Sequence, residues 1–167
     1  VLLDTAPAGA ESVVPPARVA ERLNQQFPMD RSRQYFTFVY GVIDTRSGEM
    51  DYVIAGHPTP VLVPRGDAPV LVAGEGFPIG MLERAWFEGR RLTLDPGDRL
   101  YFYTDGVIEA AGADEREYGI DRLLAAIERH RDHPLRAAID AIAAEVYDWS
   151  GGRLQDDVSL LAVERDA

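Results

Sequence analysis

Turn residues interrupt the chain at short intervals between positions 35 and 104, and this feature limits the fold more than any other. The apolar runs between these turns have the length of β-strands, and consecutive strands joined by short turns pair antiparallel. The first run is apolar on both alternating faces, which indicates a strand covered on both sides. The six runs are residues 35–43, 50–55, 60–63, 70–72, 86–94 and 99–104.

Helical patterns flank this strand-rich region. Pro15-Pro16 opens a first helix, which ends at Pro28. Apolar residues then recur at steps of three and four in 120–127 and in 135–149, and a last strand covers 158–163. This order predicts an α+β domain over residues 15–167. We interpret residues 1–14 as a linker or as the remnant of a truncated element.

The composition excludes several classes of function. The net charge of −11 argues against a nucleic acid partner, because phosphate binding needs a surface of Lys and Arg. No apolar run approaches the roughly 18 residues of a membrane span, and the apolar N-terminus is too short for a signal peptide. Because the sequence has no cysteine, it has neither a disulfide nor a thiolate metal site, in keeping with a cytoplasmic protein.

Aspartates at the ends of apolar strands are the candidate site residues. Asp105 directly follows the strand at 99–104, and the pair Asp156-Asp157 directly precedes the last strand. Carboxylate oxygens are the ligands that Mg²⁺ and Mn²⁺ prefer, and rigid strand ends can direct two carboxylates at one ion. The same residues are also ordinary turn and loop formers. Spacing alone does not decide between the two interpretations.

Six short motifs follow one another along the chain: Ala55-Gly56-His57-Pro58-x-Pro60, Gly76-x-Pro78-Ile79-Gly80, Leu94-x-Pro96-Gly97-Asp98-x-Leu100, Tyr103-Thr104-Asp105-Gly106-Val107-x-Glu109-Ala110, Tyr118-Gly119, and Asp156-Asp157-Val158-Ser159-Leu160-Leu161. Each is weak alone. As an ordered set they closely resemble the SpoIIE/RsbU family of bacterial serine/threonine protein phosphatases, which belongs to the metal-dependent PP2C-like superfamily. The resemblance extends over nearly the whole chain.

The resemblance implies a PP2C-like sandwich of two antiparallel β-sheets flanked by α-helices, with a site for two Mn²⁺ or Mg²⁺ ions at one end. Asp105 and Asp156 match metal-ligating, catalytic aspartates of the family, and Asp157 stands beside the second. Gly106 would let the backbone approach the site, and His57 belongs to a motif without an assigned chemical role. Water activated by two metal ions would attack the phosphoester, so no protein nucleophile is needed.

The family's upstream motifs, Gly-Gly-Asp and Asp-Val-x-Gly-His-Gly, have no counterpart here. They supply the aspartate that bridges both metals and a backbone ligand, so the N-terminal strands and half of the metal site are missing. We therefore expect residues 1–167 alone to be inactive. The edge left without those strands should make the chain self-associate, for example as a homodimer, or leave it marginally stable.

By resemblance, the substrate is a phosphorylated serine/threonine protein, namely a small anti-sigma-factor antagonist, and a receiver or sensor domain precedes the phosphatase domain. The alternative is a pseudophosphatase, a regulatory domain that binds a partner without catalysis.

Overall fold

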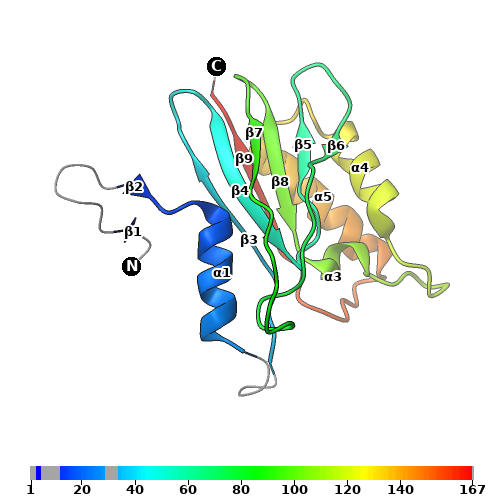
Figure 1. Ribbon diagram of the computed structural model, residues 1–167. Coiled ribbons are helices and arrows are strands. Elements are labelled where there is room, and N and C mark those ends of the chain that lie inside the picture. Colours follow the sequence, from blue (N-terminus) through cyan, green and yellow to red (C-terminus); the bar gives the residue numbers. More distant parts are fainter. Residues whose placement is uncertain (1–2, 5–11, 29–33, 167) are drawn as a thin grey trace. The chain divides into compact units, whose positions relative to one another are not determined.

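A computed structural model describes residues 3–4, 12–28 and 34–166 (Figure 1). The chain divides into two compact units, Val1–His57 with Ala73–Thr93 and Pro58–Val72 with Leu94–Ala167. Each unit contains an antiparallel sheet together with helical structure, so the expected α+β class with two antiparallel sheets is confirmed. None of the helices within the described ranges has the length and apolar character that crossing a membrane requires.

The first unit is built on a three-stranded sheet in the order β3-β4-β7. Helix α1 (Pro16–Gln26) packs on β4 and β3, and its buried Ala20 meets Val53, Ala55, Ile79 and Phe87 in a small core. The three strands are β3 (Phe38–Ile43), β4 (Glu49–Ala55) and β7 (Arg90–Thr93). Two further short strands, β1 (Leu3–Asp4) and β2 (Ser12–Val13), pair with each other. The rest of the expected linker up to residue 11 lies outside the described residues.

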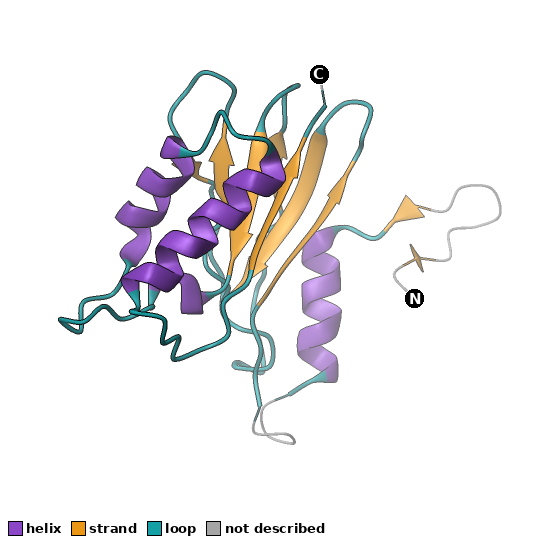
Figure 2. Ribbon diagram, turned by 180° about the vertical axis from the view of Figure 1, so that it is seen from behind, coloured by secondary structure: helices purple, strands orange, loops and turns teal. Residues whose placement is uncertain are grey.

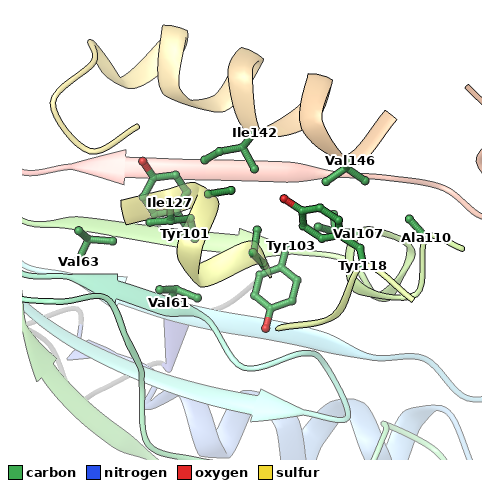
Figure 3. Packing of buried hydrophobic residues seen from close by; sticks show 12 residues of the cluster. Val61, Val63, Tyr101, Tyr103, Val107, Ala110, Tyr118, Ile127, Ile142 and Val146 are labelled. Carbon is green, nitrogen blue, oxygen red and sulfur yellow. The ribbon is translucent and has the colours of Figure 1, made fainter. Parts of the chain in front are cut away.

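The second unit is built on a four-stranded sheet in the order β6-β5-β8-β9. Its strands are β5 (Val61–Val63), β6 (Val70–Leu71), β8 (Arg99–Tyr103) and β9 (Leu160–Glu164). Helices α4 (Gly119–Arg129) and α5 (Leu135–Trp149) lie over one face of this sheet, seen from the helix side in Figure 2. Because both helices are amphipathic, their apolar faces form a core with β5 and β8. Figure 3 shows this packing around Tyr101, Ile127 and Ile142.

The structure begins two of the expected strands later than the sequence suggests. The strand expected at 86–94 is only β7 at Arg90–Thr93, and Trp86 is 73% exposed. Strand β7 pairs with β4 only as far as Tyr52. Beyond that residue the segment around Gly76 lies along β4 instead, and the carbonyl of Gly76 accepts the N–H of Gly56 at 2.7 Å. The strand expected at 158–163 begins only at Leu160. The sequence also misses the four-residue helix α3 (Asp105–Ile108), which begins directly after β8.

The strand expected at 35–43 is β3 at Phe38–Ile43, preceded by a single bridge between Phe36 and Ile79. The expected cover on both faces is wrong for the described residues, because the side chains of β3 are half-buried or exposed. Within the described ranges β3 pairs only with β4, so its outer edge has no strand partner.

Candidate functional site

The first candidate aspartate, Asp105, lies two residues beyond the end of β8 and begins α3. Its side chain is exposed, and its Oδ1 accepts the N–H of Gly106 at 3.0 Å. Its carbonyl accepts the N–H of Glu109 at 2.9 Å, which closes the short helix. The backbone thus turns sharply after the strand and leaves one carboxylate oxygen without a hydrogen bond in the described structure.

The other two candidate aspartates, Asp156 and Asp157, lie in the segment Asp156–Ser159. This segment, here called the acidic segment, leads into β9. Asp156 and Asp157 are both exposed, and Oδ1 of Asp156 accepts the N–H of Asp157 at 2.7 Å. Strand β9 runs antiparallel to β8, with Leu160 opposite Tyr103. Because one strand ends where its antiparallel neighbour begins, β8 and β9 bring Asp105 and the acidic segment to the same edge of the sheet.

Gly106 lies against the acidic segment. A Cβ added to Gly106 would lie 2.6 Å from the carbonyl oxygen of Asp157, a distance that real Cβ atoms essentially never show, and 3.1 Å from the carbonyl carbon of the same residue. Gly106 is buried, so its neighbours leave little room to move. A glycine is therefore needed here for space.

The carboxylate oxygens at this edge of the sheet are the type of ligand that a hard divalent cation prefers, but they are too few to complete its coordination. Asp105, Asp156 and Asp157 offer only oxygen, the donor that Mg²⁺ and Mn²⁺ prefer. Within the described ranges, however, no group of three or more His, Cys, Asp or Glu side chains is placed to hold a metal ion. These aspartates can therefore supply part of a ligand set, with water or further protein groups as the remainder.

His57 belongs to the first unit, whereas the three aspartates belong to the second. Its Nδ1 lies 3.4 Å from Oγ1 of Thr37. The neighbouring Gly56 has a φ of +67°, and a Cβ there would lie 2.5 Å from Cγ of Pro78. Gly56, next to His57, thus packs closely against Pro78 within the first unit.

Asp98, from the Pro-Gly-Asp motif, is a buried structural carboxylate rather than a candidate ligand. It is 5% exposed, and its two oxygens accept the backbone N–H groups of Arg65 at 2.7 Å and Asp95 at 2.9 Å. Its own backbone N–H donates to the carbonyl of Asp95 at 2.9 Å. The carboxylate therefore holds together the turn before β8 and the end of β5.

The structural roles of Thr104 and Asp98 could not be predicted from the sequence. Thr104 joins β8 to the acidic segment through its side chain, although a threonine before Asp-Gly reads as a helix cap. In the sequence Asp98 looks like a solvated turn residue. Its hydrogen-bond partner, the backbone N–H of Arg65, lies 33 residues earlier and cannot be recognised from local sequence. The only available signal was the presence of both residues inside the ordered motifs.

Comparison with known proteins identifies related chains. A family model described as Stage II sporulation protein E (SpoIIE) matches residues 2–166. The chain is 35% identical over 80 residues to the phosphoserine phosphatase RsbP of Bacillus subtilis (strain 168), covering 48% of this chain and 20% of RsbP. It spans about a fifth of the length of the curated relatives it matches.

Two solved structures are similar. The SiaA-PP2C domain of Pseudomonas aeruginosa matches with a TM-score of 0.76 and 21% identity, over 90% of this chain and 61% of that chain. The phosphatase domain of the cell fate determinant SpoIIE from Bacillus subtilis, presoaked with Mn, matches with a TM-score of 0.68 and 18% identity, over 96% and 77%. The expected PP2C-like fold is therefore confirmed.

Proposed function

Because this chain belongs to the SpoIIE family, we propose that it is part of a metal-dependent phosphatase domain that removes phosphate from serine or threonine of a bacterial signalling protein. One observation carries the proposal. The two segments that bear Asp105 and Asp156, 51 positions apart in the sequence, meet at one edge of the β8–β9 pair with their carboxylates exposed. The similarity to the phosphoserine phosphatase RsbP supports the same class of reaction.

In the proposed site Asp105 and Asp156 hold a divalent cation, Mn²⁺ or Mg²⁺, and Asp157 stands beside them. Each of the first two carboxylates already accepts the N–H of the following residue through Oδ1, which orients it and leaves oxygen lone pairs for an ion. When bound, such a cation supplies charge neutralisation for the phosphoryl oxygens and an acidified water as the nucleophile. Gly106 contributes space, because a side chain there would push the acidic segment away.

The exposed position of the three aspartates agrees with a protein substrate, whose phosphorylated residue must reach the site from outside. We propose a small phosphorylated anti-sigma-factor antagonist as this substrate, and a receiver or sensor domain as the input to the phosphatase. Both follow from the resemblance of the motifs to the family.

The test is phosphate release from a phosphoserine-bearing protein by the native full-length protein, with and without Mn²⁺. We expect release that depends on the metal. Asp105→Asn and Asp156→Asn should each lower the rate about a hundredfold or more, since each removes a charged ligand without changing side-chain size. Asp67→Asn is the matched control, because Asp67 is an exposed aspartate in the turn between β5 and β6.

Release without a metal requirement would overturn the proposed mechanism. If the native protein releases no phosphate but still binds a phosphorylated partner, it is instead a pseudophosphatase that acts by binding. If Asp67→Asn lowers the rate as much as the other two substitutions, the site has been assigned to the wrong aspartates.

A further inference from the structure

Thr104 stands at the position before the first turn of α3, where a threonine ordinarily caps the helix with its side-chain oxygen. Its side chain makes no capping hydrogen bond. The N–H of Val107 bonds to the carbonyl of Thr104 at 3.0 Å instead, and the carboxylate of Asp105 accepts the N–H of Gly106. The hydroxyl of Thr104 is therefore available for hydrogen bonds outside α3.

That hydroxyl connects β8 to the acidic segment. Oγ1 of Thr104 donates to the carbonyl oxygen of Asp157 at 2.9 Å and accepts the N–H of Ser159 at 2.9 Å. The backbone N–H of Thr104 donates to the carbonyl of Ser159 at 3.1 Å. One residue thus makes three hydrogen bonds to the acidic segment, all beyond Tyr103 and Leu160, the last paired residues of the two strands.

These bonds act on the immediate neighbours of both candidate ligands. Thr104 directly precedes Asp105, and its hydroxyl bonds to the carbonyl of Asp157, which directly follows Asp156. Gly106, on the other side of Asp105, touches the same carbonyl, so the acidic segment is held by a hydrogen bond and limited by a steric contact. A movement of the segment by a fraction of an ångström would change the spacing of the two carboxylates.

We propose that Thr104 is a positioning residue, whose hydroxyl sets the spacing between the carboxylates of Asp105 and Asp156 for a divalent cation. This inference rests on the proposed function, since it assumes that the two aspartates bind the same cation site. Thr104 itself contacts no ion in this scheme. Its β-branched side chain has few rotamers, which helps to keep the hydroxyl between its two partners.

The test measures Mn²⁺ binding to the native full-length protein by the loss of the electron paramagnetic resonance signal of free Mn²⁺. Thr104→Val keeps the shape of the side chain but removes both hydroxyl hydrogen bonds, and it should raise the Kd for Mn²⁺ about tenfold. Thr104→Ser keeps the hydroxyl and should stay within about threefold of the unsubstituted chain. Thr93→Val, at an exposed threonine of β7, is the matched control and should change nothing.

Thermal unfolding of each variant separates a positioning role from a purely structural one. If Thr104→Val lowers the melting temperature but binds Mn²⁺ as before, the positioning role is refuted. If the unsubstituted full-length protein binds no Mn²⁺ at millimolar concentration, the proposed metal site fails and the positioning role fails with it. Should Thr104→Val not fold, Gly106→Ala decides: it forces the same segments apart, and unchanged Mn²⁺ binding there would overturn the inference.

Discussion

Replacing Asp98 by alanine tests whether the Pro-Gly-Asp motif is structural. The substitution removes the acceptor of two hydrogen bonds to a charged, 5% exposed carboxylate, from the backbone N–H groups of Arg65 and Asp95. Such bonds contribute about 1.5–3 kcal/mol each. Arg65 and Asp95 are themselves exposed, so water can replace part of the loss. We therefore expect Asp98→Ala to lower the free energy of unfolding by about 2–4 kcal/mol.

The assay is thermal and urea unfolding followed by far-ultraviolet circular dichroism. A loss of this size lowers the melting temperature by roughly 5–15 °C for a chain of this length. Asp98→Asn keeps one acceptor oxygen and should lose about half as much. Asp67→Ala, at an exposed turn aspartate of the same unit, is the control and should stay within about 0.5 kcal/mol of the unsubstituted chain.

Two results would refute this reasoning. If Asp98→Ala unfolds at the same temperature as Asp67→Ala, the buried carboxylate does not hold the turn. If Asp98→Ala keeps its stability but loses Mn²⁺ binding, the motif contributes to the metal site and the structural interpretation is wrong.

Residues 1–167 should release little phosphate from a phosphoserine peptide even at millimolar Mn²⁺, and robust turnover would show that their ligand set is sufficient. The outer edge of β3, which has no strand partner among the described residues, should make the chain self-associate or leave it marginally stable; a monomer over a concentration series in sedimentation with an ordinary melting temperature would contradict this. Burial raises the pKa of Glu145, but the hydrogen bonds with His130 and Arg129 lower it by more. The net effect places this pKa below its ordinary value of 4.5. This carboxylate therefore stabilises the fold above that pH and loses its effect as the pH falls through the lowered pKa. Glu145→Gln should lower the free energy of unfolding at pH 7 by less than about 1 kcal/mol, and this loss should shrink as the pH falls through the lowered pKa, as urea unfolding at a series of pH values would show.

Local patterns in the sequence are sufficient to predict most elements of this protein. The helices α4 and α5 follow from apolar residues at steps of three and four, since burial of one helix face requires that period. Strand β8 follows from an apolar run bounded by turn residues. The ordered motifs predict the family and the candidate aspartates, because each motif is readable within a few residues.

Only the tertiary structure decides which distant residues meet. The hydroxyl of Thr104 bonds to residues 53 and 55 positions away, and the carboxylate of Asp98 to an N–H 33 positions away. These contacts depend on the register between β8 and β9 and on the path of the turn before β8. A period of two in a strand specifies which face is buried but not which residue of a distant strand lies opposite. For the same reason the sequence could propose Asp105 and Asp156 as partners, whereas the role of Thr104 between them emerged only from the paired strands.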